Sequence, residues 1–407
     1  LTEVHSMLQR MNELAVQAAN GTNSKDTDRK AIQDEIDQLN TEIDRVAETT
    51  KFNEIYLLKG DDGEKTVNMK AHDAGLKGTL TDNGDGTATF KMDTLNAGDT
   101  VSIGGKNYTI GGEAADVTDM LTKAGITDAA GDKVTINGKE YTYCENASDG
   151  KTALTHKGYY ETAPDTANAA TANPAYADSA AIAAAKSATI SVGTKSITTI
   201  DDTKADGIDD NDTSVITKQK AYELAGKELL AANQIGDTEG NAEVKNGDKT
   251  DLAYNAGDGT FNIKVGQAKV ANTLSFSLHV GADADMTNKI TVDIETMNSA
   301  NLGIKGLNVT DKNGSAATYA IDAISDAISK VSSQRSALGA VQNRLEHTID
   351  NLDNISENTS SAESRIRDTD MAKEMVNYSK NNILAQAGQS MLAQANQSNQ
   401  GVLSLLQ

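Results

Sequence analysis

The chain has 407 residues, which is long enough for several domains with buried cores. Its formal charge of -22 would repel a nucleic-acid backbone or an anionic membrane surface, and no run of about 18 apolar residues is present that could span a bilayer. Aromatic residues, the usual anchors of enzyme cores and ligand pockets, make up only 4% of the chain. The composition therefore argues against an enzyme, a nucleic-acid-binding protein or a membrane protein. It favours long helices packed through aliphatic side chains, together with thin β layers.

Residues 1–60 carry the spacing of two amphipathic helices. The first helix is predicted to end near Asn20, where glycine and polar residues follow. The second begins near Asp28, and its apolar residues from Ile32 to Val46 step by four and three, as in coiled coils. Polar residues between them, such as Asp44, are expected on a solvated outer face. Because the helical spacing is already present at Leu1, we expect an earlier part of the first helix to be missing.

Residues 61–300 lose the helical period, and Thr, Val, Ile and Tyr alternate with polar residues between Gly, Asn and Asp turns. This pattern predicts strands. We divide the region into a β-rich domain at 61–162, an Ala-rich linker at 163–189 and a continued β-rich domain at 190–300.

An internal repeat lies in this region, because residues 99–109 recur as residues 132–142. Each copy is predicted to be a hairpin that turns at its glycines, and a short helix near 116–124 should join the two. A second inserted helix is predicted at 218–232.

Helical spacing returns near residue 301. The apolar residues from Ile321 to Leu352 step by three and four, which predicts a helix over about 318–358. Such a helix cannot bury its apolar side alone, and the helices of residues 1–60 have the matching period. We therefore predict an α+β multi-domain protein. Both chain ends should form one long antiparallel, coiled-coil-like bundle, with the β-rich region inserted between them. Residues 301–371 are the C-terminal part of this helical domain.

The last segment, 372–407, has no charged side chain after Lys380. We expect its apolar side to be buried inside an assembly of several chains, where a charge would be costly but an amide could still hydrogen-bond. The alternative is a frayed, adhesive tail, because a single helix of this kind is marginal in water. The apolar residues proposed for such an assembly core are Ile383, Leu384, Met391, Leu392, Val402, Leu403, Leu405 and Leu406.

No pattern for catalysis is found. The five histidines are dispersed, and the zinc-peptidase, phosphate-loop, dinucleotide and serine-hydrolase motifs are absent. The single Cys144 is interpreted as a small buried side chain. The acidic run 206–212 resembles a calcium loop only faintly, since its glycine is misplaced and no glutamate closes it, so a solvated acidic loop is expected. We predict no catalytic, cofactor-binding or metal-binding residues and no cofactor.

Several motifs resemble those of bacterial flagellins, in the order in which that family has them. They cover about residues 1–60 and 300–407, whereas the middle of the chain resembles nothing identifiable. The motifs are the runs at 8–20, 42–46, 51–53, 338–346, 362–368, 391–397 and 402–406.

The resemblance implies a structural subunit of the flagellar filament that serves motility. It implies export through the flagellar apparatus without a cleaved signal, an extracellular location, and other flagellin subunits, an export chaperone and a cap protein as partners. In the family both terminal helices line the filament core as a coiled coil, and the variable middle faces the medium. The resemblance places the start of this chain after the first core helix, so we expect that it does not polymerise by itself.

The resemblance also implies recognition by the innate immune receptor Toll-like receptor 5. The receptor contacts of the family correspond to positions on the first two helices that can equally serve bundle packing or subunit contacts. These positions are Gln9, Arg10, Glu13, Leu14 and Glu35.

Three alternatives stay open. A hook–filament junction protein shares the terminal helices but lacks the full set of motifs. A flagellin with an inserted peptidase would need a zinc-binding motif that is absent here. A flagellin whose variable domain acts as an adhesin for carbohydrates is compatible with the β-rich middle.

Overall fold

The computed structural model describes residues 1–22, 27–254, 257–281 and 288–405, with only the backbone at Leu405. These residues form two compact units, which are considered separately. The first consists of Leu1–Ser275 and Asp293–Arg335, and the second of Phe276–Val292 and Ser336–Gln407.

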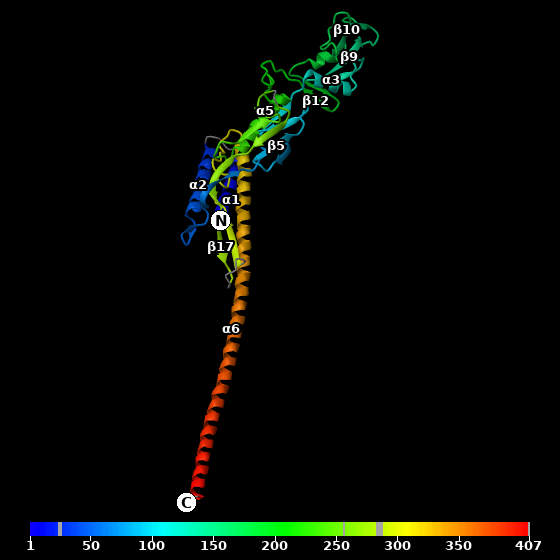
Figure 1. Ribbon diagram of the computed structural model, residues 1–407. Coiled ribbons are helices and arrows are strands. Elements are labelled where there is room, and N and C mark those ends of the chain that lie inside the picture. Colours follow the sequence, from blue (N-terminus) through cyan, green and yellow to red (C-terminus); the bar gives the residue numbers. More distant parts are fainter. Residues whose placement is uncertain (23–26, 255–256, 282–287, 406–407) are drawn as a thin grey trace. The chain divides into compact units, whose positions relative to one another are not determined.

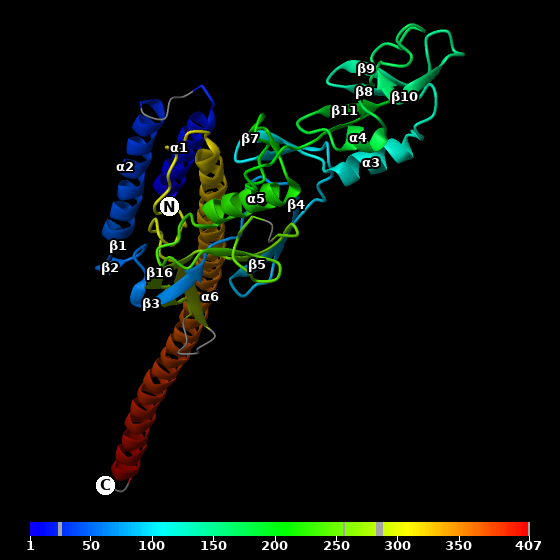
Figure 2. The same ribbon diagram turned by 90° about the horizontal axis from the view of Figure 1, so that it is seen from above.

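The terminal helices of the first unit pack together. Helix α1 spans Thr2–Ala19, α2 spans Asp28–Thr49, and α6 begins at Ser315. Figures 1 and 2 both show α1 beside the first turns of α6. The carbonyl of Ala19 lies against Gly314, directly before α6, so the two helices run antiparallel. The predicted packing of the two chain ends is confirmed. The buried apolar residues of these helices include Val4, Leu8, Met11, Leu14, Ala15, Ala18, Ile32, Ile36, Ile43, Ala47, Ala317, Tyr319, Ala320, Ala323, Ile324, Ala327 and Val331.

One buried arginine joins the helix ends. Arg29, in the first turn of α2, is only 1% exposed. Its guanidinium donates to backbone carbonyls at the end of α1 and in the loop before α6, where helix carbonyls have no partner within the helix. The acceptors are Ala18 O at 2.8 Å, Asn20 O at 3.3 Å, Asp311 O at 2.9 Å and Lys312 O at 3.1 Å.

Further polar side chains of α2 bind the backbone of the segment 299–312, which leads into α6. The prediction that Asp44 lies on a solvated outer face is therefore wrong, since its carboxylate accepts hydrogen bonds from Ser299. The hydrogen bonds are Gln33 Nε2 to Leu307 O (2.8 Å), Val309 N to Gln33 Oε1 (2.8 Å), Asn40 Nδ2 to Ile304 O (3.2 Å), and Ser299 N and Oγ to Asp44 (2.6 and 2.8 Å).

Two antiparallel strands close the base of the β-rich insertion. Strand β3 spans Asp61–Asn68 near its beginning, and β16 spans Gln267–Asn272 near its end. The two pair directly, with Val67 opposite Ala268. A short hairpin precedes them, formed by β1 (Lys51–Phe52) and β2 (Ile55–Tyr56).

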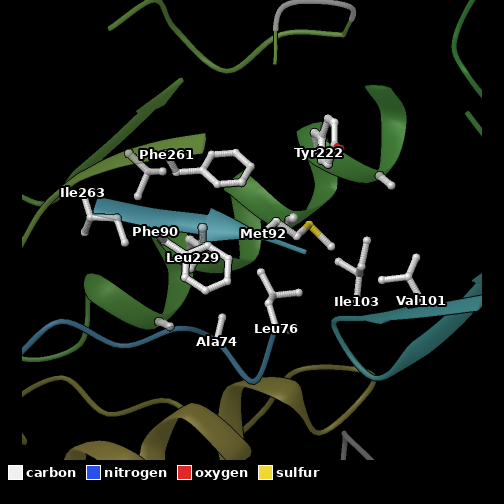
Figure 3. Packing of buried hydrophobic residues seen from close by; sticks show 14 of the residues in the cluster. Ala74, Leu76, Phe90, Met92, Val101, Ile103, Tyr222, Leu229, Phe261 and Ile263 are labelled. Atoms are coloured by element: carbon white, nitrogen blue, oxygen red, sulfur yellow. The ribbon is translucent and has the colours of Figure 1, made fainter. Parts of the chain in front are cut away.

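The larger core of the insertion lies between a four-stranded sheet and helix α5 (Lys218–Asn233). The sheet order is β14-β15-β5-β4, formed by Glu243–Asn246, Thr260–Lys264, Thr87–Met92 and Gly78–Asp82. Figure 3 shows Phe90 of β5 and Phe261 of β15 gathered with Tyr222 and Leu229 of α5. Tyr319 of α6 belongs to the same cluster, so this core continues onto the terminal helix.

Both copies of the sequence repeat are hairpins, as predicted. The first is β6 (Thr100–Ile103) with β7 (Lys106–Ile110), and the second is β8 (Lys133–Ile136) with β9 (Lys139–Asn146). Helix α3 (Ala114–Lys123) joins them.

The two hairpins belong to different sheets. The first pairs with β13 (Val215–Ile216) in a three-stranded sheet. The second lies in a sheet of order β10-β9-β8-β11-β12, whose other strands are Ala153–Tyr160, Thr189–Val192 and Lys195–Thr198. The Ala-rich segment 163–189, with the short helix α4 (Ser179–Ala183), therefore connects strands β10 and β11 of one sheet.

In the second unit, helix α6 continues without a break, so that the whole helix spans Ser315–Leu405. The helix continues across the domain boundary that was expected after residue 371, because no proline or glycine turn interrupts the chain there. From Asp353 to Ser404 every residue is exposed. A hairpin of β17 (Leu274–His279) and β18 (Lys289–Ile294) begins and ends in the first unit.

Replacing the buried arginine should loosen the terminal helices. We expect Arg29→Ala to lower the free energy of unfolding by about 3 kcal/mol or more, because buried carbonyls lose their donors and a cavity remains. The measurement is urea unfolding followed by the helical circular dichroism signal. Arg45→Ala is the control, since Arg45 is exposed and pairs only with Glu42 one turn away. Equal stability of the two variants would contradict the role of Arg29.

Candidate functional site

The C-terminal half of α6 exposes a row of large apolar side chains. The six of the predicted core residues that the structure describes have side chains between 56% and 70% exposed. The side chain of Leu405 and all of Leu406 lie outside the described residues. Isolated apolar residues are ordinary on protein surfaces, but a contiguous row marks an interaction surface.

These six residues spread over roughly 200° of the helix circumference, centred on a line through three of them. At 3.6 residues per turn, Leu384, Met391 and Val402 point within about 20° of one another. Gln386 and Gln389 lie roughly 140° to 160° away from Leu384. The apolar side would gain about 1.5 to 3 kcal/mol for each large residue that a partner fully covers. We call the six described residues, Ile383, Leu384, Met391, Leu392, Val402 and Leu403, the apolar row.

A second candidate surface lies on α1 and α2. The Arg10 guanidinium donates to Glu35 at 2.8 Å and lies 3.4 Å from Glu13, so three of the five predicted contact residues come together. The Glu35 carboxylate, ahead of Glu13, raises the pKa of Arg10. Gln9 is exposed nearby, but Leu14 is only 2% exposed and belongs to the helix core.

Because this ion pair is exposed, solvent screens it and it contributes little to stability. Arg10, Glu13 and Glu35 therefore stay available to a partner, whereas Leu14 supports the surface only by packing beneath it.

The β1–β2 hairpin presents a third exposed patch that the sequence analysis did not single out. Phe52 is 74% exposed, and Ile55 and Tyr56 are also exposed. The two turn residues, Asn53 and Glu54, both have positive φ (47° and 69°). The left-handed region is strained for a glutamate, and such strain is typical of segments constrained by function. The sequence feature that could have revealed this patch is the presence of bulky apolar residues on both sides of a two-residue turn.

The acidic run is packed, and the expectation of a solvated loop is wrong for Asp209, which is 2% exposed. Its carboxylate accepts from the backbone N–H groups of Asp201, Asn211 and Asp212 and from the Ser187 hydroxyl. The carboxylates thus serve the loop backbone. Among the described residues, no group of three or more His, Cys, Asp or Glu side chains could hold a metal ion.

Comparison with known proteins identifies the terminal regions. Residues 1–62 match the bacterial flagellin N-terminal helical region, and residues 321–406 match the bacterial flagellin C-terminal helical region. A flagellin of Clostridium tyrobutyricum is 34% identical over 405 residues, which cover 98% of this chain and 79% of that protein. The chain belongs to the flagellin family.

Other relatives agree with this assignment. Polar flagellin A of Vibrio parahaemolyticus is 30% identical over 408 residues, covering 100% of this chain and 78% of that protein. A flagellin of Bacillus subtilis is 50% identical over 169 residues, covering 37% and 54%. A solved structure of FliC from Burkholderia pseudomallei covers 84% of this chain and 95% of that one, with 16% identity and a TM-score of 0.27, too low to support an argument about fold.

This flagellin is therefore a structural subunit of the bacterial flagellar filament, and its family polymerises subunits of this kind. The two family regions coincide with α1 and α2 at one end and with most of α6 at the other. Within the part of this flagellin that the structure describes, no helix is long and apolar enough to cross a membrane.

The packed acidic loop should weaken in acid. For Asp209, burial alone would raise the pKa, but the combined hydrogen bonds lower it. For Asp210, Lys204 and then Thr203 lower the pKa to about 2. Since both folded-state values lie below the usual value of about 4, the stabilisation is complete above pH 4 and is lost as the pH falls toward 2.

We therefore expect the melting temperature of the β-rich region to fall between pH 5 and pH 2.5, as followed by calorimetry. Asp209→Asn should already melt lower at pH 5 and show a flatter pH dependence, because the amide cannot accept every hydrogen bond that the carboxylate does. Asp370→Asn, at an exposed position of α6, is the control. A variant curve parallel to that of the unmodified protein would refute the role of Asp209.

Proposed function

We propose that this flagellin is secreted, extracellular and non-enzymatic, and that the apolar row of α6 is buried in the interior of the filament. The observation that carries the proposal is the row itself, exposed along a helix with no charged side chain after Lys380. A helix with this composition is unfavourable in water but well suited to a dry interior where amides pair with amides. The export chaperone and the filament cap are proposed as further partners of the assembling subunit.

A single charge placed on either side of the helix tests this proposal. Met391→Glu puts a carboxylate in the apolar row, and Gln389→Glu puts one on the opposite side, two residues away. The substitutions are made in the bacterium that produces the protein. Filaments on cells are counted by electron microscopy, and subunits released into the medium are measured by immunoblot.

We expect Met391→Glu to reduce filament number at least tenfold while subunits still appear in the medium, because a buried unpaired charge costs several kcal/mol per subunit. Gln389→Glu should have a much smaller effect. If both variants form filaments as well as the unmodified protein, the row is an adhesive tail and not an assembly surface. Absence of both variants from the medium would place the defect in secretion and count against the proposed extracellular route.

A second proposed function is recognition by Toll-like receptor 5 through Gln9, Arg10, Glu13 and Glu35. The specific support is the Arg10–Glu35 pair, which joins α1 and α2 on an exposed surface while adding little to the fold. Desolvated arginines are frequent hot spots in protein interfaces. Leu14 enters this proposal as a core residue that fixes α1, not as a direct contact.

Exchanging the two charges tests whether Arg10 and Glu35 contact a receptor or only stabilise the fold. The double variant Arg10→Glu/Glu35→Arg keeps an ion pair between the helices but reverses the charges that a receptor meets. We expect it to lower receptor-reporter activation at least tenfold while its melting temperature stays near that of the unmodified protein. Arg45→Ala, which removes a similar exposed pair with Glu42, should activate normally. Normal activation by the double variant would exclude these two charges as receptor contacts.

A further inference from the structure

A lysine amine, a carboxamide and a carboxylate meet beneath the start of α6. Lys330 projects from the first part of this helix onto the turn that contains Asn301, which is 2% exposed. Lys330 Nζ donates to Asn301 O at 2.9 Å and to Asn301 Oδ1 at 3.0 Å. Glu295 Oε2 lies 3.5 Å from the same amine. All three residues belong to the first compact unit.

The distances suit a reaction and not only a hydrogen bond. Because Oδ1 is bonded to Cγ at about 1.2 Å, the amine lies at most about 4.2 Å from the carboxamide carbon, close to the near-attack range of about 3 to 3.5 Å. The Asn301 side chain cannot turn away freely, since its Nδ2 donates to Thr296 O at 2.5 Å.

The surroundings make the Lys330 ammonium group easier to deprotonate than a lysine in water. The Asn301 turn is enclosed by residues such as Met297, Ala300 and Leu302, all buried. Burial lowers the pKa of Lys330, and nearby Lys65 lowers it further, while Glu295 opposes both. A lysine whose pKa is lowered in this way is the form in which lysines act as nucleophiles in proteins.

We propose that Lys330 Nζ attacks Asn301 Cγ and forms an intramolecular isopeptide bond, with Glu295 carrying the proton and ammonia leaving. The Glu295 carboxylate first takes a proton from the Lys330 ammonium group. The neutral amine then adds to Cγ, and one of its protons passes to Nδ2. The Cγ–Nδ2 bond breaks with its electron pair on nitrogen, and the proton held by Glu295 leaves with the product as ammonium. Nothing is oxidised or reduced, and no external reagent is needed.

The bond would join α6 covalently to the segment 299–312, which α2 already holds through hydrogen bonds. A cross-link between residues 301 and 330 closes a loop within the chain and so restricts the unfolded state. It can form only after these residues have met in the folded subunit. The chain is therefore unconstrained until it folds and locked afterwards.

Mass spectrometry of the purified full chain tests the proposal. The intact mass should lie about 17 Da below the sequence mass, the difference that released ammonia leaves. Tryptic digestion should yield a branched peptide that joins residues 290–305 to residues 313–335, uncleaved after Lys330. An intact mass equal to that of the sequence, with separate peptides ending at Lys305 and Lys330, would overturn the proposal without any variant.

Three variants assign the chemistry. Lys330→Arg keeps the positive charge but cannot form the bond, and Glu295→Gln keeps the shape but cannot carry the proton, so both should show the full sequence mass. Lys70→Arg is the matched control, because Lys70 pairs with Asp326 of α6 at 2.9 Å and takes no part in the proposed step, and it should keep the 17 Da loss. Cyclisation at an Asn-Gly pair such as Asn137-Gly138 gives the same mass loss. A loss that persists in Lys330→Arg would therefore refute the isopeptide bond.

Discussion

The structure of the helical base depends on satisfying one set of backbone carbonyls. Three chain segments meet around the buried Arg29 where α1 ends, α2 begins and α6 is about to start. The Arg29 guanidinium supplies the donors for this junction, and its acceptors come from residues far apart in the chain. A lysine could not replace it, because only the planar guanidinium presents several donors in fixed directions. The packing of apolar residues on either side of the junction presupposes that these carbonyls are paired.

The same principle extends along α2. Residues 299–312 form turns and irregular backbone, and side chains of α2 supply hydrogen bonds to part of it. Gln33 does so most completely, since its amide both donates to Leu307 O and accepts from Val309 N. This arrangement fixes where α6 starts. It also allows the β-rich insertion to leave and re-enter the base through one pair of strands, β3 and β16.

The two halves of α6 differ in whether their apolar side is buried within the chain. In the first unit, Ala320, Ile324 and Val331 are covered within the chain itself. In the second unit, every described side chain from Asp353 to Ser404 is exposed, although residues such as Leu384 and Met391 are equally apolar. A helix that leaves such a side exposed is incomplete as a monomer, and we propose that polymerisation covers it. The filament is thus the state in which the hydrophobic effect acts on the whole chain.

The sequence alone determined the local elements. The steps of three and four apolar residues predicted α1, α2 and the part of α6 over about 318–358, but not its continuation to Leu405. The repeated glycine turns predicted the β6–β7 and β8–β9 hairpins. These features depend on neighbours within a few residues. The family motifs at both ends, and the uncharged apolar row after Lys380, were also recognised from the sequence. Whether the predicted contact residues serve a receptor or neighbouring subunits stays a prediction.

The tertiary structure decided which of these elements share a surface. The two repeat hairpins have similar sequences but lie in different sheets, and the segment 163–189, expected to link two domains, connects strands of one sheet. From the sequence, Asp44 and Asp209 were predicted to be solvated charges. In the structure, Asp44 accepts a hydrogen bond from the distant backbone N–H of Ser299, and Asp209 accepts one from the backbone N–H of Asp201. No local pattern could reveal this, because the partners of a polar side chain are chosen by the fold, whereas its helical or strand spacing is set by the chain itself.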